Sequence, residues 1–473
     1  MQNKRAIIGV LIVAVVGAVV VIASLNRAPR RREPITDGRY NVLLVTLDTT
    51  RADHLGCYGY SRDTSPNLDA LANDAVRFDE AISASAVTPM SHASILTGLY
   101  PHQHGLRVFY GRTGYFLSES VPTLAGILRA QGWQTAAFIS AYPASERFGL
   151  HWGFDVFETD VADEVKDRDP KLRPPEDGIW LRQRTATAQR RADATTDQAL
   201  EWLYDIGNPF FMWVHYFDPH DMSLVPPEDI TERFDARPDK PRAVLDAYDA
   251  EIYFMDQQFG RLIDFLKETG QYESTVIAVI ADHGQGLGDH NWDPHRLLYQ
   301  EQVQLPLIVR WPGGPHGDTE RTVVRSIDVM PTILDVVGVE PAGHVEGKSL
   351  LPLVAGKEPE RRFAMAEALN LLDYHAPRQL PPRLKDNLFC VVEAPWKLIY
   401  HHDEPQNTEL YYLDTDPHEL HDVALENMDV VERLVDRLKR SGIMDIQIAE
   451  PESPMDEETA DKLRALGYLP SDE

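Results

Sequence analysis

The sequence predicts an α/β protein with a large, mostly parallel sheet flanked by helices and a smaller C-terminal α+β subdomain. Largely apolar runs of strand length recur at residues 41–47, 135–139, 210–215 and 276–281. Segments with apolar residues at helical spacing lie between them. Strands that alternate with helices are typical of parallel sheets covered on both faces. Near Pro341 the pattern changes, so we expect a main domain at 41–340 and a subdomain at 341–473.

The N-terminal segments are unlike the rest of the chain. A short tail, residues 1–5, precedes an unbroken apolar run from Ala6 to Leu25. Twenty helical residues span about 30 Å, the thickness of the hydrocarbon core of a bilayer. We therefore expect a single transmembrane anchor at 6–25, joined to the body by a basic linker at 26–40. Counted alone, the four arginines just after the run favour a cytoplasmic body.

Composition restricts the class of partner. The chain has 46 basic and 74 acidic residues, a formal net charge of −28. Without a basic field the body cannot displace counterions from a phosphate backbone, which excludes nucleic acid as a partner. The two cysteines, Cys57 and Cys390, cannot form a disulfide framework, and we interpret them as ordinary small residues of the interior.

Two helices and an insertion are predicted within the main domain. The first helix begins after Ser65, a favourable N-cap, with a proline in its first position. The second, Asp246 to Thr269, has an amphipathic stripe of apolar residues. Residues 160–191 are charged and interrupted by prolines, which indicates a surface insertion.

The C-terminal subdomain is predicted from a denser pattern. Short strands are expected at 389–392, 396–400 and 410–413, before a helix at 430–440. We interpret His401 and His402 of this region as a solvated pair.

Polar residues end three of the predicted strands. Asp48 follows the first, Asp282 and His283 follow the fourth, and His215, Asp218 and His220 lie at the end of the third. Because parallel strands meet a ligand at their carboxyl ends, we expect these side chains to lie on one rim of the sheet. Mixed carboxylate and imidazole ligands suit a divalent ion such as Zn²⁺, Mn²⁺ or Mg²⁺.

Several motifs follow one another in order along the chain. They are NVLLVTLDTTRADHLGCYGY, SAVTPMSHASILTGLYPHQHGL, FMWVHYFDPHD, IAVIADHGQGLGDH, RSIDVMPTILDVVGV and ELYYLDTDPHELHDVA. The series resembles the sulfatase family of the alkaline phosphatase superfamily, from about Tyr40 to Ala424. The resemblance implies a metal-dependent hydrolase that acts on a phosphate or sulfate ester, and it favours an exported body, periplasmic or extracellular.

The resemblance also implies a metal site. Carried over position by position, it makes Asp48, Asp282 and His283 ligands of a divalent ion, which could be Zn²⁺, Mn²⁺, Mg²⁺ or Ca²⁺. A further aspartate that ligates the metal in the family is replaced here by Thr49. Asp218, His220 and His295 together could form a second ion site, since Asp218 and His220 are two residues apart and can face one side of an extended stretch.

The family's nucleophile signature differs in this chain. Thr88 takes the place of the cysteine that is oxidised to formylglycine, and His92 the place of the arginine. His220 matches a histidine that contacts the substrate, and His295 falls where sulfatases have a lysine. Threonine has a methyl group on the carbon that would be oxidised, so we expect no formylglycine and an unmodified Thr88 nucleophile beside the metal.

Four functions are compatible with these residues. The first is hydrolysis of phosphate esters with Thr88 as nucleophile and the three histidines as groups that stabilise charge or donate a proton. The second is sulfate-ester hydrolysis, which the overall resemblance favours. The third is transfer of a phospho-head-group at a membrane, and the fourth is binding without catalysis.

Overall fold

The computed structural model describes residues 39–109, 115–159, 161, 189–207, 209–222, 226–235, 244–358, 361–373 and 382–446. The predicted anchor at 6–25 and most of the predicted insertion at 160–191 lie outside these residues. In the part of the chain that is described, no helix is both long and apolar enough to span a membrane.

The main sheet confirms the predicted fold class. Within the described residues it has nine strands in the order β4-β3-β5-β1-β6-β7-β2-β8, with β9 beside β2, and all but β7 run in the same direction. The strands are β1 (Asn41–Leu47), β2 (Val76–Ile82), β3 (Gln134–Ile139), β4 (Val156–Glu158), β5 (Phe210–Tyr216), β6 (Thr275–Ala281), β7 (Gln304–Arg310), β8 (Asp318–Glu320) and β9 (Val324–Arg325). The first strand made, β1, is therefore central, between β5 and β6.

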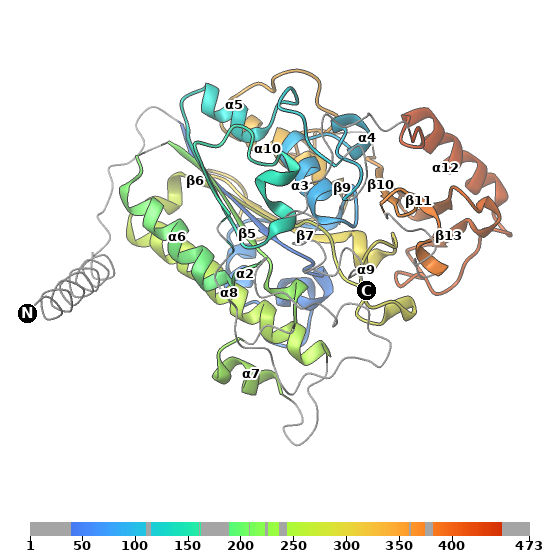
Figure 1. Ribbon diagram of the computed structural model, residues 1–473, viewed down its shortest axis with the longest axis horizontal. Coiled ribbons are helices and arrows are strands. Elements are labelled where there is room, and N and C mark those ends of the chain that lie inside the picture. The colour runs from blue at the N-terminus through green and yellow to red at the C-terminus, as the bar shows by residue number, and fades with distance from the viewer. Residues whose placement is uncertain are drawn as a thin grey trace, which may run out of the picture.

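Helices cover both faces of this sheet (Figure 1). One face packs against α3 (Thr88–Thr97), α5 (Leu124–Ala130), α10 (Val329–Val336) and α11 (Leu351–Val354). The other packs against α2 (Pro66–Ala72), α6 (Ala192–Asp205), α7 (Glu228–Phe234) and α8 (Val244–Glu268). Alternate residues of β1 point into the two cores, Val42 and Leu44 into the first and Leu43 and Val45 into the second. This is why strands buried on both faces are continuous apolar runs rather than alternating ones.

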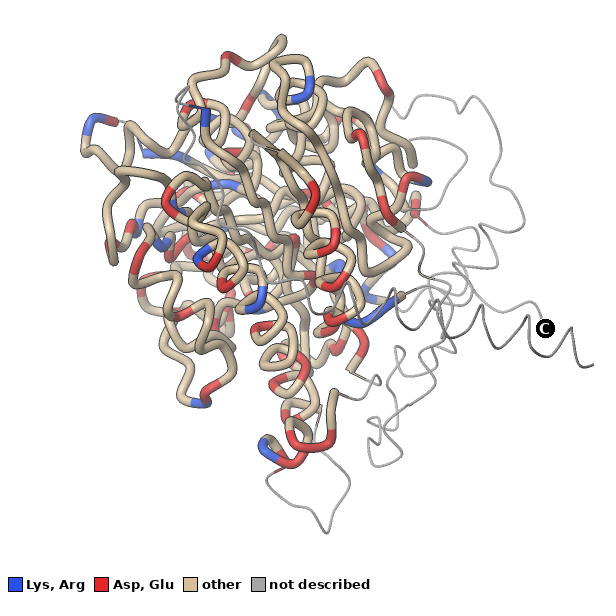
Figure 2. The backbone as a smooth tube through the Cα atoms, turned by 90° about the vertical axis from the view of Figure 1, so that its left-hand side faces the viewer, with Lys and Arg blue, Asp and Glu red and all other residues tan. Residues whose placement is uncertain are grey.

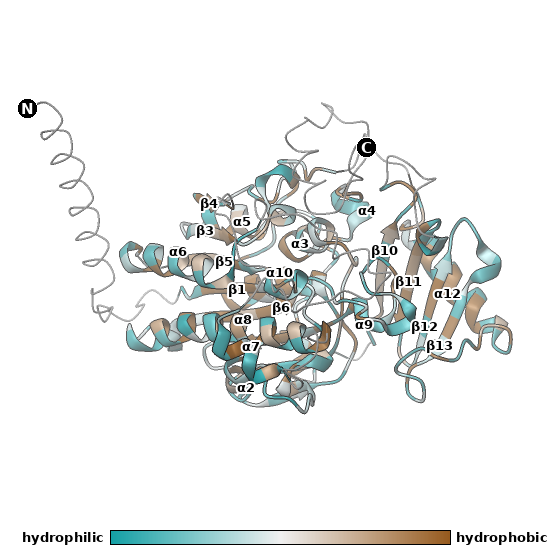
Figure 3. Cartoon of the chain, turned by 60° about the horizontal axis from the view of Figure 1, so that its bottom comes forward, coloured by the Kyte–Doolittle hydropathy of each residue, from teal (hydrophilic) through white to brown (hydrophobic). Residues whose placement is uncertain are grey.

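A four-stranded antiparallel sheet forms the C-terminal region, again as predicted. Its order is β10-β11-β12-β13, and α12 covers one of its faces. The other face packs on the main domain near α9, as Figures 1 and 3 show. The elements are β10 (Ala364–Leu369), β11 (Asn387–Glu393), β12 (Trp396–His401), β13 (Glu409–Tyr412), α9 (Gln300–Val303) and α12 (Met428–Ser441).

Local details differ from the sequence expectation at the start of α2. Ser65 occupies the N-cap position, but its hydroxyl makes no capping hydrogen bond. Instead, the Asp256 carboxylate of α8 accepts hydrogen bonds from the backbone N–H groups of Asn67 and Leu68. A carboxylate satisfies these exposed N–H groups better than a hydroxyl, because it is charged and has two acceptor oxygens. Both cysteines are free; Cys390 is buried, as expected, whereas Cys57 is only partly buried.

Charged positions are interspersed along the described chain (Figure 2). Many are paired: Asp53 lies 2.6 Å from Arg51, and His54 lies 2.8 Å from Asp249 of α8. The first pair lies within the loop after β1, and the second joins that loop to α8.

Candidate active site

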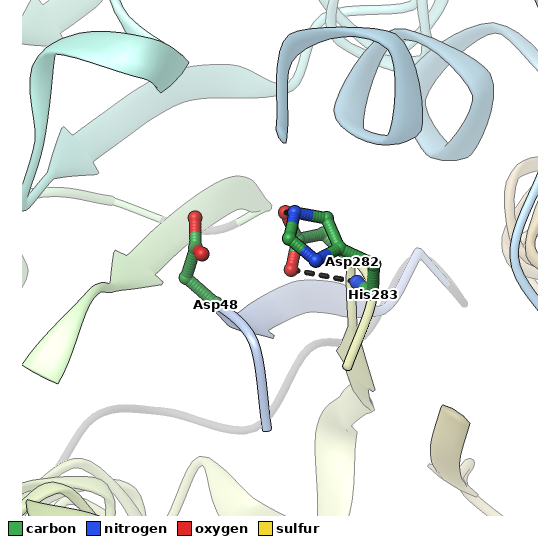
Figure 4. Close-up of side chains that lie close together, drawn as sticks. All are labelled: Asp48, Asp282 and His283. Atoms are coloured by element: carbon green, nitrogen blue, oxygen red, sulfur yellow. Dashed lines mark hydrogen bonds and ion pairs between the residues drawn. The ribbon is translucent and has the colours of Figure 1, made fainter. Parts of the chain in front are cut away.

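Three potential metal ligands converge at the carboxyl ends of two neighbouring strands (Figure 4). Asp48 follows β1, and Asp282 and His283 follow β6. The last residues of these strands, Leu47 and Ala281, are paired in register, so the residues after them are placed side by side. One ligand atom from each of the three side chains lies within 4.8 Å of the others, and all three side chains are completely buried.

The two carboxylates each have one oxygen without a hydrogen-bond partner. In Asp282, Oδ1 accepts from the N–H groups of Thr49, at 3.1 Å, and His283, at 2.7 Å. Asp282 Oδ2 accepts no hydrogen bond, and neither does Asp48 Oδ1. Buried oxygens in this state are costly unless a cation or donor satisfies them, so these atoms fit ligation of a metal ion.

Electrostatics also fit a bound cation. Burial raises the pKa of Asp48 well above its ordinary value. Burial, and then the adjacent Asp48 charge, raises the pKa of Asp282 in the same way. His283 Nδ1 lies 2.9 Å from the carbonyl oxygen of Gly284, which only accepts, so Nδ1 has the hydrogen and Nε2 has the lone pair that a metal needs. The residues present therefore suit a divalent ion.

Thr88 lies directly against this group. It is the first residue of α3, and Pro89 follows it in the first turn, where a missing N–H costs nothing. The Thr88 hydroxyl lies 3.3 Å from His283 Nε2, and its closeness to Asp48 offsets a small part of the rise in the pKa of that carboxyl that burial causes. A buried hydroxyl is thus held between two of the three potential ligands.

His92 has both ring nitrogens engaged. Its Nδ1 donates to the carbonyl oxygen of Thr88 at 2.8 Å, so Nε2 accepts from the Thr46 hydroxyl at 3.0 Å. The Thr46 hydroxyl in turn accepts from the Trp213 indole at 2.9 Å. Burial lowers the pKa of His92 well below its ordinary value, consistent with this neutral form. In this arrangement His92 braces the backbone of Thr88, while its Nδ1 stays 3.6 Å from Asp282 Oδ2.

His215 is a site residue that the sequence analysis placed at the end of a strand without giving it a role. Its Nε2 lies 3.1 Å from Asp48 Oδ2. Residues 46 and 215 are paired across β1 and β5, which brings the ring beside Asp48. The sequence indicates that His215 lies at the end of a strand. It does not indicate that this strand lies next to β1, which is what brings His215 to Asp48. A histidine that hydrogen-bonds a ligating carboxylate fixes the orientation of that ligand.

His220 ends a short 3-10 helix that follows β5, and His295 lies in the connection before α9. The ring centroid of His295 is 4.4 Å from that of His283 and 5.7 Å from that of His220. His295 Nδ1 donates to the carbonyl of Ala86 at 2.7 Å, so Nε2 is its unprotonated nitrogen. His220 stacks on Phe217 at 4.2 Å. Burial lowers the pKa of His220 to about 4 and holds that of His295 well below its ordinary value.

The comparisons with known proteins agree with this geometry. The sulfatase family profile matches residues 40–339. The chain belongs to the sulfatase family. A profile described as the C-terminal part of N-sulphoglucosamine sulphohydrolase matches residues 288–443, which include the antiparallel sheet. The sequence resemblance to sulfatases, and the expectation of an ester hydrolase, are thereby confirmed.

Individual relatives of this sulfatase-family chain are distant. It is 24% identical to an N-acetylglucosamine-6-O-sulfatase of Bacteroides thetaiotaomicron, over 81% of this chain and 82% of the relative. It is 27% identical to the multifunctional alkaline phosphatase superfamily protein PehA of Trinickia caryophylli, over 82% and 91%. The crystal structure of a phosphonate monoester hydrolase of Agrobacterium radiobacter superposes with a TM-score of 0.65 at 22% identity, over 85% and 95%. The similarity to the phosphonate monoester hydrolase, at 22% identity, shows that the two proteins share a fold.

The second predicted ion site is not brought together in this sulfatase fold. Asp218 Oδ1 accepts from the backbone N–H of Ala192 at 2.9 Å and so caps the start of α6. Burial raises the pKa of Asp218 to about 7. Of the three predicted ligands, His220 and His295 are neighbours, while Asp218 serves the helix. Among the described residues, the group of Asp48, Asp282 and His283 is the one with metal-ligand geometry.

Proposed function

We propose that this protein is a metal-dependent hydrolase of phosphate esters that uses the Thr88 hydroxyl as its nucleophile. The observation that supports the proposal most directly is the position of that hydroxyl, which is completely buried and lies 3.3 Å from His283 Nε2. A nucleophile needs this closeness to the groups that activate it. Membership of an ester-hydrolase family supports the reaction class.

The proposed first step is an in-line displacement at phosphorus. The Thr88 oxygen bonds to phosphorus, the bond to the ester oxygen breaks, and the hydroxyl proton passes to the neighbouring Asp48 carboxylate. The leaving oxygen takes a proton from His220, which burial keeps neutral in the free site and which the negative charge of a bound phosphate ester would help to protonate. His92 holds the backbone of Thr88 through the first turn of α3, so the hydroxyl stays aimed at the site.

The second step regenerates the enzyme. Water attacks the phosphorus of the phosphothreonine and gives a proton to His220, the bond between phosphorus and the Thr88 oxygen breaks, and that oxygen takes back the proton held by Asp48. His295 lies beside His283 and is positioned to stabilise the non-bridging oxygens, together with the N-terminal end of α3. A divalent ion held by Asp48, Asp282 and His283 would lower the pKa of the nucleophile and offset the charge of the phosphoryl oxygens.

The ligand types support a transition-metal ion over Ca²⁺. Ca²⁺ prefers six to eight oxygen ligands, whereas two carboxylates and an imidazole suit Zn²⁺ or Mn²⁺. Thr49 stands in place of the family's further aspartate and so removes one carboxylate from the site. The smaller number of oxygen ligands also favours Zn²⁺ or Mn²⁺ over Ca²⁺.

Sulfate-ester hydrolysis is the second candidate. The observation that favours it is the match to relatives that are named sulfatases, among them the Bacteroides protein. Thr88 argues against it, because threonine cannot be oxidised to the aldehyde on which formylglycine chemistry depends.

The test is a substrate panel. The full chain would be assayed with p-nitrophenyl phosphate, bis-p-nitrophenyl phosphate, a phosphonate monoester and p-nitrophenyl sulfate, each with Zn²⁺, Mn²⁺, Mg²⁺ and Ca²⁺. We expect turnover of a phospho-substrate with Zn²⁺ or Mn²⁺, and a fall of at least about a thousandfold in Thr88→Ala.

Thr97→Ala is the matched control, since Thr97 is a buried threonine of the same helix whose hydroxyl bonds only within α3 and to the turn that follows it. Sulfate as the preferred substrate, with full activity in Thr88→Ala, would disprove the proposal. Transfer of the phospho-group to an added alcohol, with little release of phosphate, would point to the transferase.

We also propose that residues 6–25 anchor the protein in a membrane with the body exported. The unbroken apolar run supports the anchor. Full-length protein should sediment with membranes and resist extraction by carbonate, and protein beginning at Glu33 should not. An added protease that cannot cross the membrane should digest the body of an exported protein in intact cells.

A further inference from the structure

A tyrosine outside the candidate site holds the loop that follows β1. The Tyr248 hydroxyl of α8 donates to the carbonyl oxygen of Thr49 at 2.6 Å and accepts from the backbone N–H of Arg51 at 2.9 Å. The Tyr248 side chain is completely buried. Burial raises its pKa well above the ordinary value, so the hydroxyl stays neutral and keeps the proton that it donates.

The loop needs such support because Thr49 has an unfavourable backbone conformation. Its φ is 51°, in the left-handed region, where a β-branched residue is strained. Its own hydroxyl is buried and has no hydrogen-bond partner, so the side chain does not offset the strain. The Tyr248 hydroxyl bonds backbone groups on both sides of Thr50, and these two bonds favour the strained form.

The strained conformation has a consequence for the metal site. It points the Thr49 N–H at Asp282 Oδ1, at 3.1 Å. With the His283 N–H at 2.7 Å, Oδ1 then has two donors, and Oδ2 is turned towards Asp48 and His283. Donors to the outer oxygen of a ligating carboxylate fix its orientation and raise metal affinity.

We propose that Tyr248 is a positioning residue of the metal centre. Its hydroxyl fixes the left-handed Thr49 peptide, and that peptide aligns Asp282. The inference rests on the proposed metal site and extends it to a residue of α8 that contacts none of the three ligands directly. A divalent metal ion is the ligand whose affinity Tyr248 sets.

The chain supplies a matched control in Tyr58. The Tyr58 hydroxyl also bridges backbone groups: it accepts from Leu307 N–H at 2.8 Å and donates towards the carbonyls of Leu307 and Phe78, at 3.0 and 3.1 Å. It does so at β7 and β2, away from the three ligands. Tyr58 belongs to the same connection between β1 and α2, but its hydroxyl contacts only backbone groups of β7 and β2, so Tyr58→Phe removes the same kind of interaction without removing a contact to residues 49–51.

The experiment compares Tyr248→Phe, Tyr58→Phe and the unchanged full chain. Co²⁺ binding would be followed by its visible absorption, and Zn²⁺ affinity by competition with a chelating dye. We expect Tyr248→Phe to bind both ions about 10–100-fold more weakly, with an altered Co²⁺ spectrum. Tyr58→Phe should stay within about twofold of the unchanged chain. Both variants should lose a few degrees of melting temperature, so stability alone will not separate them.

A second variant tests the route through Thr49. Glycine adopts the left-handed conformation freely, so Thr49→Gly in the Tyr248→Phe background should recover part of the lost affinity. Equal metal affinity in Tyr248→Phe and the unchanged chain would overturn the inference. So would an equal loss of affinity in Tyr58→Phe, because the effect would then be general.

Asp282→Asn separates this inference from the proposed function. If the unchanged chain binds no more tightly than Asp282→Asn, the metal site itself is wrong, and the role of Tyr248 is wrong with it. If the unchanged chain binds tightly and Tyr248→Phe binds equally well, the metal site stands and only the role of Tyr248 fails.

Discussion

The two sheets of this protein contribute to the candidate site in different ways. Strands of the main sheet end directly at Asp48, Asp282 and His283, so its register alone places the three side chains. The C-terminal sheet contributes no member of that group. Its residues instead hold the loop that contains His295, on the other side of the site.

The contacts of the C-terminal sheet centre on the residue after His295. Arg296 has a φ of 86°, and its side chain pairs with Asp373, which follows β10. The side-chain amide of Asn370 donates to the Arg296 carbonyl at 3.1 Å. A strained residue is thus kept in place by a separate sheet. The main sheet positions the three proposed metal ligands through backbone pairing. Side chains that follow a strand of the second sheet position His295. Mutations in the two regions should therefore have different effects on metal binding and on activity.

The largest effect is expected from a change to one of the three proposed metal ligands at the ends of the main-sheet strands. Asp282→Asn removes one anionic ligand, and kcat/KM should fall about 10³–10⁴-fold. Asparagine keeps an acceptor for the N–H groups of Thr49 and His283 and removes a buried charge, so metal-free protein should be at least as stable as the unchanged chain. Steady-state kinetics and thermal melting in chelator measure the two effects. A large fall in stability in chelator would contradict the prediction.

The next largest effect is expected from a mutation that weakens the contact between the C-terminal sheet and the main domain. Lys397 of β12 is completely buried, 2.7 Å from Glu419, and Glu419 also accepts from the backbone N–H of Gln300 in α9. Lys397→Met leaves that carboxylate buried without its cation, and should cost about 3–5 kcal/mol in the free energy of unfolding. Urea titration measures the cost.

The double variant Lys397→Met/Glu419→Gln is its control, and it should recover most of the lost free energy. No recovery would mean that the packing of Lys397, rather than its charge, stabilises the interface. Metal affinity should stay unchanged in both variants if the two sheets act separately.

A smaller effect is expected at the loop of His295. Asn370→Ala removes the donor to the Arg296 carbonyl, and should cost about 1–2 kcal/mol of stability. It should also lower kcat/KM by about tenfold, through a misplaced His295, at unchanged metal affinity. Steady-state kinetics will measure the fall in kcat/KM, and a metal titration will show whether the metal affinity is unchanged. Weaker metal binding in Asn370→Ala would show that the two sides of the site are coupled.

The smallest expected effect is a pH dependence within the C-terminal sheet alone. Partial burial alone would lower the pKa of His401, but the hydrogen bonds that its ring donates to the Asp386 and Glu409 carboxylates outweigh burial and raise the pKa to about 9. A raised folded-state pKa means that the stabilisation is complete below the unfolded value, about 6.5, and is lost as pH rises through about 9. Because the pKa values of Asp386 and Glu409 are lowered, both stay charged across this range.

His401→Gln should therefore cost about 1 kcal/mol at pH 6 and close to nothing at pH 10. Chemical unfolding of both proteins at the two pH values measures the difference. A cost that is the same at both pH values would show that the charge of His401 is irrelevant.

Much of the fold was predictable because strands buried on both faces produce apolar runs that end at polar residues. The positions of β1, β5 and β6 follow from such runs, and with them Asp48, Asp282 and His283. Side-chain contacts across elements were not predictable, since their partners depend on strand order and helix placement. His215 beside Asp48 and Asp256 at the start of α2 are of this kind. The expectation of a solvated His401 was wrong for the same reason: residue 386 lies 15 positions away, and its carboxylate is 2.8 Å from the ring.

The central position of β1 has a consequence for how the protein is made. This strand leaves the ribosome early, but β6, one of its two neighbours in the sheet, is made after β5. The hydrogen bond from the Thr49 N–H to Asp282 joins residues that are 233 positions apart. Until β6 has been synthesised, Asp48 and Thr88 have no partners with which to hold an ion. Long-range pairing of this kind closes slowly, after most of the chain exists. A nascent chain that has not yet reached His283 therefore lacks two of the three proposed ligands, so the proposed metal site cannot form before β6 has been made.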